Sequence, residues 1–207
     1  MNASARGTGR QYWVGLRALL VLTVVLGVAY PLVVTGIGQL AFPNQSNGST
    51  VSSGGKVTGS ALIGQSFTDK KGNPLPQWFQ SRPSAAGNGY DGGSSSGSNY
   101  GPNNPDLLKA IKQRQQTIEK TDGVSASQIP ADALTASGSG LDPHISPAYA
   151  LLQVDAVAKA RGISADSVRK LVNDHVQQRD LGYLGEPTVN VLQLNIALAA
   201  MDPSGNK

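Results

Sequence analysis

Two short stretches of this sequence contain residue types that could support hydrolysis. Residues 93–97 (GSSSG) match the G-x-S-x-G pattern of serine hydrolases, in which a strand leads into the serine and a helix leads out of it. Ser139, Asp142 and His144 lie close together in SGSGLDPHIS. A serine nucleophile, a histidine base and an orienting carboxylate are the groups that acyl transfer needs. Either stretch could act only if the surrounding elements hold its side chains in line.

Neither stretch has the flanking elements that such chemistry requires. Residues 85–104 are so rich in Gly, Ser and Asn that they cannot build a core, which predicts a long loop around the GSSSG motif. One short loop rarely directs three triad side chains in line, so we expect Asp142 and Ser146 to cap neighbouring backbone instead. No catalytic residue is therefore predicted. An anchored extracytoplasmic hydrolase that uses Ser139 is kept as the alternative interpretation.

Metal and phosphate chemistry have no support in the sequence. Cysteine is absent, which excludes thiolate metal sites, disulfides and cysteine nucleophiles together. The two histidines, His144 and His175, lack the spacing of a zinc motif, and His175 is expected to be a partly buried helix residue. No GxxxxGK[ST] phosphate loop occurs. We predict no metal site and no cofactor of the chain's own.

Four asparagines lie at the starts of expected elements or on apolar helix faces: Asn99, Asn103, Asn190 and Asn195. A buried amide must find hydrogen-bonding partners. Internal capping is the expected role of these side chains. The alternative, which the sequence leaves open, is that some of them meet the backbone of another subunit.

A long apolar run precedes all of these residues. Residues 18–42 contain no charged side chain and exceed the about 20 residues that a helix needs to cross about 30 Å of hydrocarbon. We expect a transmembrane helix over residues 14–42, with a kink rather than a break at Pro31. A cleaved signal peptide fits less well, because the run is too long and Gln39 stands where cleavage requires a small residue.

Small residues within this run offer places for contact with another membrane helix. Glycines let two helix backbones approach closely. The residues of the anchor that we expect to take part in such packing are Gly27, Pro31, Gly36 and Gly38. The lipid bilayer is therefore an expected partner of the chain.

The charges on either side of the run predict its orientation. The basic residues that precede it are Arg6, Arg10 and Arg17, and none follows it until Lys56. Basic flanks stay in the cytoplasm, so residues 1–13 are predicted to form a cytoplasmic tail. Residues 43–56 are predicted to be a flexible spacer, and residues 57–207 a single extracytoplasmic domain. The chain is thus expected to be a single-pass protein of the cell membrane.

The predicted outer part is nearly neutral. Of the 17 basic residues in the chain, 14 lie beyond the anchor. All 13 acidic residues also lie there, so the charges nearly balance. Apart from the pair Lys70 and Lys71, these basic residues are scattered. A nucleic-acid partner is therefore not expected.

The outer part begins with strand signals and continues with helix signals. Residues 57–67 and 77–81 read as short extended segments. Helix start and stop signals then predict helices over 104–120, 146–162, from 164 onward, and 190–200. Early strands and later helices indicate the α+β class.

Six blocks of sequence, in this order, resemble the C subunit of the Kdp-type potassium-transporting ATPase. They are GSALIGQSF at 59–67, WFQSRPSA at 78–85, SGSNYGPNNPDL at 96–107, TASGSGLDPHISP at 135–147, QVDAVAKARG at 153–162 and GYLGEPTVNVLQLNIAL at 182–198. The chain departs from the family pattern at Asp155 and Ala156, where proline and arginine are usual, and in a longer, glycine-rich loop over 86–95.

The resemblance implies a non-enzymatic subunit of a high-affinity, ATP-driven potassium importer. The implied partners are a channel-like potassium-binding subunit, a P-type ATPase subunit and a small membrane peptide, and the complex rather than this chain handles ATP and potassium. Such subunits are described as catalytic chaperones that raise the ATP affinity of the ATPase subunit. The resemblance and the polar pattern together select candidate contact or motif residues: Gln65, Arg82, Ser98, Asn99, Asn103, Ser139, Asp142, His144, Gln153, Glu186, Asn190 and Asn195.

Overall fold

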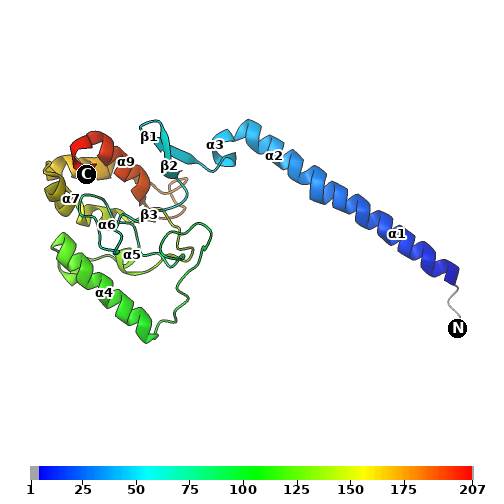
Figure 1. Cartoon of the computed structure of the whole chain (residues 1–207), viewed down its shortest axis with the longest axis horizontal. Coiled ribbons are helices and arrows are strands. Elements are labelled where there is room, and N and C mark those ends of the chain that lie inside the picture. The colour runs from blue at the N-terminus through cyan, green and yellow to red at the C-terminus, as the bar shows by residue number, and fades with distance from the viewer. Residues whose placement is uncertain (1–4, 207) are drawn as a thin grey trace. The chain divides into compact units, whose positions relative to one another are not determined.

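The computed structural model describes residues 5–206, and the side chains from residue 7 onward. The first four residues of the predicted cytoplasmic tail, and the last residue of the predicted domain, lie outside the described range. The chain divides into two compact units, and the division falls between Ser49 and Thr50. Figure 1 labels most of the helices and strands of both units along the chain.

The first unit is a long helix followed by a helical turn. It comprises α1 (Ala5–Val24), a π-helical turn (Val25–Ala29), α2 (Tyr30–Ala41) and the short α3 (Pro43–Ser46). The stretch Gly7–Ala41 is long and apolar enough to cross a membrane, and its side chains are not buried within the protein. This agrees with the predicted single membrane span.

Pro31 does not interrupt this helix. Proline has no N–H, and its ring clashes with the carbonyl four residues earlier, here that of Gly27. The π-helical turn Val25–Ala29 includes Gly27, and it widens the helix backbone just before the proline. The helix therefore continues into α2 without a break (Figure 1).

The second unit begins with a hairpin. Strands β1 (Thr50–Ser53) and β2 (Lys56–Ser60) pair antiparallel, with Thr50 opposite Ser60. The two residues between them, Gly54 and Gly55, both have positive φ, of 58° and 77°, which a two-residue hairpin turn requires. Helix α3 and strand β1 thus lie within residues 43–56, and the flexibility expected of this stretch stays a prediction.

The helix α4 (Pro105–Asp122) begins where the sequence predicts. Asn104 is its N-cap, and the side-chain oxygen accepts a hydrogen bond from the N–H of Asp106 at 2.7 Å. Gly123 ends the helix in the left-handed conformation, with φ of 70°. A short 3₁₀ turn (Ala126–Gln128) and the single turn α5 (Ala131–Leu134) follow.

The predicted helix over 146–162 is in fact two helices, α6 (Pro147–Leu152) and α7 (Val154–Arg161). The break lies at Gln153, whose side-chain amide donates to the carbonyl of Tyr149 at 3.3 Å. A side chain that bonds the carbonyl four residues earlier competes with the backbone hydrogen bond of the helix. Ser146 caps α6 by accepting from the N–H of Tyr149 at 3.1 Å, as expected.

The remaining elements complete an α+β fold. Helices α8 (Ala165–Asp174) and α9 (Val191–Met201) occur as predicted, and a 3₁₀ turn (Pro203–Asn206) follows. Three short strands, β3 (His144–Ile145), β4 (Val176–Gln177) and β5 (Thr188–Asn190), form an antiparallel sheet in the order β3-β5-β4. These strands were not predicted from the sequence, because each is only two or three residues long.

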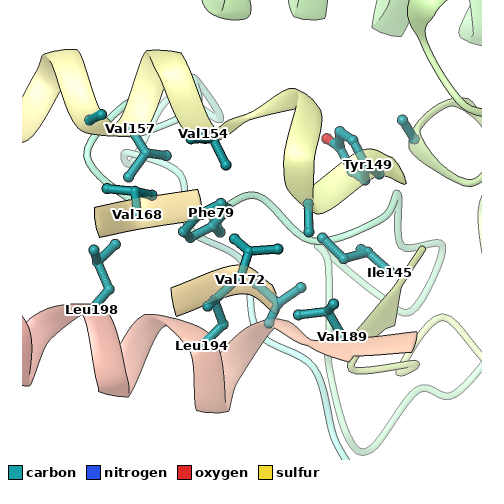
Figure 2. Packing of buried hydrophobic residues seen from close by; sticks show 14 of the residues in the cluster. Phe79, Ile145, Tyr149, Val154, Val157, Val168, Val172, Val189, Leu194 and Leu198 are labelled. Atoms are coloured by element: carbon teal, nitrogen blue, oxygen red, sulfur yellow. The ribbon is translucent and has the colours of Figure 1, made fainter. Parts of the chain in front are cut away.

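One apolar core holds this unit together. Figure 2 shows Phe79 among side chains of α7, α8 and α9, close to Val154, Val172 and Leu194. All four of these side chains are fully buried. The predicted extended segment at 77–81 is therefore a core-crossing segment, and the expectation that it is a strand is wrong, since it pairs with no strand in the described chain.

Candidate functional site

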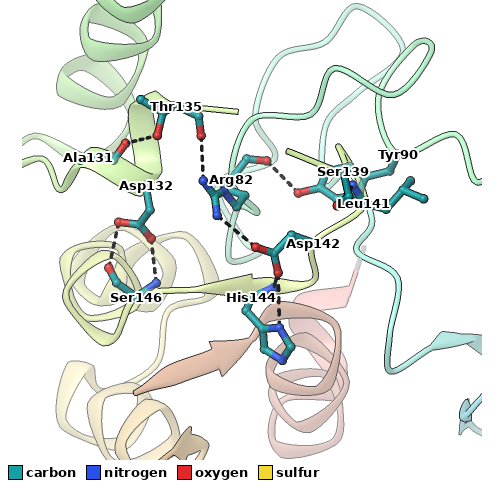
Figure 3. Close-up of polar contacts among 10 residues, drawn as sticks. All are labelled: Arg82, Tyr90, Ala131, Asp132, Thr135, Ser139, Leu141, Asp142, His144 and Ser146. Carbon is teal, nitrogen blue, oxygen red and sulfur yellow. Dashed lines mark hydrogen bonds and ion pairs between the residues drawn. The ribbon is translucent and has the colours of Figure 1, made fainter. Parts of the chain in front are cut away.

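Asp142 is the centre of the polar cluster that the sequence singled out. Its carboxylate accepts hydrogen bonds from Nη1 of Arg82 at 3.0 Å and from the N–H of His144 at 3.0 Å. Nδ1 of His144 lies 3.3 Å from the same carboxylate. Burial alone would raise the pKa of Asp142, but the hydrogen bonds from His144 and Arg82 together lower this pKa below its ordinary value. Figure 3 shows Asp142 between its two partners.

Ser139 does not join this cluster as a nucleophile would. Its hydroxyl accepts from the N–H of Leu141 at 3.1 Å, and no hydrogen bond between Ser139 and His144 is found among the described residues. The ring of His144 is directed away from Ser139 (Figure 3). Activation of a serine needs a base within hydrogen-bonding reach. The cluster therefore has the backbone-capping arrangement that we expected of Asp142.

The backbone of Ser139 instead holds the glycine-rich loop. Its carbonyl accepts from the N–H of Ser96 at 2.9 Å and from the hydroxyl of Ser95 at 3.0 Å. At Gly140, with φ of 68°, an added Cβ would lie 2.6 Å from the carbonyl oxygen of Ser96, so only glycine fits. The GSSSG motif has neither a strand before it nor a helix after it. These residues join two loops and do not form a nucleophile elbow.

Two buried amides hold the core-crossing segment in place. The side chain of Asn195 accepts from the N–H of Phe79 at 3.0 Å and donates to the carbonyl of Phe79 at 2.9 Å. Gln153 accepts from the N–H of Gln80 at 2.6 Å and donates to the carbonyl of Gln80 at 3.3 Å. These side chains supply the hydrogen bonds that a neighbouring strand would otherwise give. Asn195 thus has internal hydrogen-bonding partners, although it pairs with a distant segment and does not cap a helix as expected.

The other predicted residues divide by exposure. Asn190 is buried, caps α9 through the N–H of Gln193 at 3.1 Å, and donates to the carbonyl of Ala61 at 2.8 Å. Gln65 is half-buried and donates to the carbonyl of Thr58 at 2.8 Å. The exposed members of the set are Ser98, Asn99, Asn103 and Glu186. Contacts of any of these residues with another subunit stay predictions.

Arg161 is a buried cation that the sequence placed only in the last turn of a helix. Its Nε donates to the carbonyl of Gln77 at 2.7 Å, and its Nη1 donates to the carbonyl of Asp202 at 3.0 Å. The guanidinium also lies over the ring of Trp78, 4.4 Å from the centroid. Burial lowers the pKa of Arg161 from its ordinary value. These partners lie far away in the sequence, so no local pattern could have identified the role of Arg161.

A groove of about 430 Å³ lies between α4 and residues 66–90. Asp122, Arg114 and Tyr149 are among its lining residues. Burial raises the pKa of Asp122 to about 6, and among the described residues this carboxyl has no hydrogen bond or ion pair. Arg114 donates to the carbonyl of Leu134 at 2.8 Å instead. Asp122 was not among the predicted residues, because nothing near it in sequence reveals that the groove desolvates it.

Comparison with known proteins explains the six sequence blocks. The family model described as "KdpC: K+-transporting ATPase, c chain" matches residues 12–200. A potassium-transporting ATPase KdpC subunit from Kineococcus radiotolerans is 51% identical over 194 residues, which cover 94% of this chain and 95% of that protein. The corresponding subunit from Methylococcus capsulatus is 52% identical over 187 residues, covering 90% and 95%. That of Streptomyces avermitilis is 47% identical over 218 residues, covering 96% and 97%.

The matched region includes most of the apolar helix and nearly all of the folded unit. Both parts of the chain therefore have counterparts in these relatives, and the resemblance inferred from the six blocks is confirmed. The chain belongs to the KdpC family, the c chain of K+-transporting ATPases.

Proposed function

We propose that this chain is a non-enzymatic subunit that stabilises a potassium-importing complex from outside the cytoplasm. As a KdpC-family member it is an accessory subunit of a potassium-transporting ATPase. The observation that carries the proposal is that one family match covers both the anchor and the folded unit. In the proposed role the anchor binds the channel-like subunit, and the folded unit covers the outer mouth of that subunit.

The proposed topology rests on the arginines before the anchor and on the absence of basic residues after it until Lys56. In this topology the folded unit and cytoplasmic ATP lie on opposite sides of the bilayer. Any rise in the ATP affinity of the P-type ATPase subunit would therefore reach it through the membrane subunits, as a coupling free energy between distant sites. The chain itself holds neither ATP nor potassium in this proposal.

The glycines of the anchor differ in how well they suit helix packing. An added Cβ at Gly36 would meet no atom of the described chain within 4 Å, whereas one at Gly38 would lie 2.9 Å from the hydroxyl of Ser46. The small size of Gly38 is thus already explained within its own unit. Gly36 has no such internal reason, which makes it the better candidate for contact with a partner helix, while Gly27 and Pro31 stay predictions.

The topology can be tested by cysteine labelling, because the natural chain contains no cysteine. Asn173 lies exposed on α8, and Thr8 lies exposed before the apolar run. Single variants Asn173→Cys and Thr8→Cys are treated with a membrane-impermeant maleimide in intact cells and in opened cells. We expect the Asn173→Cys variant to react in both preparations and the Thr8→Cys variant to react only in opened cells. The reverse pattern would overturn the proposed topology.

Assembly is tested by co-purification with the other transporter subunits from membranes. Gly36→Leu should release the chain from the complex, because the longer side chain separates the two helix backbones. Gly15→Leu is the matched control, since an added Cβ at Gly15 also meets no atom within 4 Å and Gly15 is not a predicted packing residue. An intact, active complex with Gly36→Leu would contradict the packing proposal.

A further inference from the structure

Two opposite charges line the groove beside α4, and neither has a charged partner. The carboxylate of Asp122 and the guanidinium of Arg114 are both half-buried, and both belong to α4. Within the described part of the chain, neither side chain forms an ion pair, and Arg114 makes only the hydrogen bond to the carbonyl of Leu134. Removing a charge from water is unfavourable unless an opposite charge or hydrogen bonds compensate it. The fold alone therefore leaves both charges without an opposite charge.

The spacing of the two charges keeps them from pairing with each other. Asp122 follows Arg114 by eight residues, which places the two backbone positions about 12 Å apart along the helix axis. Ile118 lies halfway between them, and spacings of four residues put the three side chains on one side of α4. Ile118 is 8% exposed and also lines the groove. Helix α4 thus presents a cation, an apolar side chain and an anion to the groove, in that order.

A buried hydroxyl near Asp122 also lacks a partner. Tyr149 is 3% exposed and lines the groove, and its hydroxyl forms no hydrogen bond with any described residue. Burial, and in addition the charge of Asp122, raise the pKa of Tyr149, so the two groups lie near each other. Buried polar side chains nearly always have a hydrogen-bond partner. The unpaired hydroxyl is therefore an independent sign that the groove receives a polar molecule.

We propose that the groove binds a small zwitterion with a short apolar chain between its two charged ends. Its ammonium group donates hydrogen bonds to Asp122 and Tyr149, its carboxylate binds Arg114, and its methylene groups pack on Ile118. Guanidinium groups suit carboxylates, because they can form two parallel hydrogen bonds. The volume of about 430 Å³ lies within the range of small-molecule sites. The inference goes beyond the proposed function, since it requires no partner subunit and no particular side of the membrane.

An inorganic ion fits the groove less well. Magnesium and calcium ions take about six to eight oxygen ligands, whereas Asp122 is the one acidic side chain among the residues that line the groove. An inorganic cation would leave Arg114 unpaired, and an inorganic anion would leave Asp122 unpaired. The remaining charged side chain of the lining, Arg82, already pairs with Asp142 at 3.0 Å. A molecule that carries one charge of each sign is the occupant that the lining favours.

The test measures binding by equilibrium dialysis with the full-length chain in detergent. The zwitterion is 5-aminopentanoate, and three compounds of similar size are compared with it. Pentylamine lacks the carboxylate, pentanoate lacks the amine, and norvaline, an isomer of 5-aminopentanoate, carries both charges at one end. We expect 5-aminopentanoate to bind at least tenfold more tightly than each of the three, since one hydrogen-bonded charge contributes a factor of about ten or more. Equally tight binding of any of the three, or no binding of 5-aminopentanoate, would overturn the inference.

Two variants test which side chain binds which end of the zwitterion. Asp122→Asn should abolish the preference for 5-aminopentanoate over pentanoate, and Arg114→Gln should abolish the preference over pentylamine. Lys112→Gln is the matched control and should bind as the natural chain does, because Lys112 is an exposed cation of α4 outside the groove. Thermal unfolding checks that the variants fold, and Asp122→Asn, which keeps the shape of the side chain, decides the case if Arg114→Gln does not fold. Unchanged preferences in a folded variant would overturn the inference.

Two further measurements separate the zwitterion from other occupants of the groove. The dialysis is repeated with the assembled complex purified from membranes, and binding of 5-aminopentanoate there supports the inference. Binding to the isolated chain alone would mean that another subunit fills the groove, and it would overturn the inference. Magnesium chloride or potassium chloride is then added at constant ionic strength. Displacement of 5-aminopentanoate by either salt would assign Asp122 to a metal ion and would overturn the inference, whereas unchanged binding supports it.

Discussion

Replacement of Asp122 by asparagine should stabilise the folded unit at neutral pH and leave it unchanged in acid. Asp122 is the last residue of α4, and burial in the groove raises its pKa to about 6. Among the described residues, no cation or hydrogen-bond donor compensates its charge. The negative end of the helix dipole lies at the same place. Asparagine has nearly the same shape and carries no charge.

The direction of the pH effect follows from the raised pKa. Between the unfolded value of 3.8 and the folded value of about 6, the unfolded chain releases the proton before the folded domain does. The contribution of Asp122 to stability is therefore lost as the pH rises through this interval. The full rise corresponds to about 3 kcal/mol. The carboxyl keeps part of its contact with water, which reduces the expected effect to about 1–2 kcal/mol.

The assay is urea unfolding of the full-length chain in detergent. A Trp13→Phe background leaves Trp78 as the single tryptophan, so fluorescence reports on the folded unit. The free energy of unfolding is measured at about pH 4 and about pH 7.5 for both proteins. Asp122→Asn should raise the free energy of unfolding by about 1–2 kcal/mol at the higher pH and by less than about 0.5 kcal/mol at the lower pH. Asp106→Asn, in the exposed first turn of α4, is the matched control and should show no gain.

Two results would refute this reasoning. An equal gain at both pH values would mean that the amide stabilises the helix by itself rather than by removing a buried charge. No gain at about pH 7.5 would mean that water or a bound cation already compensates the carboxylate. Either result would mean that burial in the groove does not raise the pKa of Asp122.

Asn195→Leu should destabilise the folded unit by about 2–5 kcal/mol, because it leaves the buried N–H and C=O of Phe79 unpaired. Urea unfolding measures this loss. Leu198→Met is a size-conserving control, for which we expect a loss of less than about 1.5 kcal/mol. Arg161→Lys should lower the free energy of unfolding by about 2 kcal/mol in the same assay, since lysine cannot both stack on Trp78 and make the directed hydrogen bonds of a guanidinium. An unchanged unfolding midpoint would mean that the contacts of Arg161 do not stabilise the folded unit. Ser139→Ala should support growth at limiting potassium as well as the natural chain does, and failure to grow despite normal assembly would revive the hydrolase interpretation.

Local signals in the sequence predicted the elements whose causes are local. The start of α4 follows from Asn104 and Pro105, and its end follows from Gly123, all within or beside the helix. The apolar run predicted the long apolar helix for the same reason, because its signal lies within the helix itself. The break at Gln153 could not be predicted in this way, because the side chain that bonds the carbonyl of Tyr149 also accepts a hydrogen bond from the N–H of Gln80, 73 residues earlier.

The polar sites show the same division. The pairing of Asp142 with His144 is a short-range hydrogen bond, and the expectation of local capping anticipated it. The partners of Arg161 and the burial of Asp122 depend on segments that meet only in the folded unit. The residue types in the sequence could therefore suggest the cluster at Asp142. They could not reveal that Arg161 lies over Trp78 or that burial raises the pKa of Asp122.

The clamp between Asn195 and Phe79 has a consequence for how the protein is made. The two residues are 116 positions apart, so the innermost part of the core cannot close until α9 has been synthesised. In the proposed topology the chain would cross the bilayer while this part is still open, which suits translocation as an extended polypeptide. Long-range closure is slow, because a large loop must be ordered before its contacts form. In that topology, late closure would delay folding until export is nearly complete, and it would avoid a premature compact state that blocks the translocation channel.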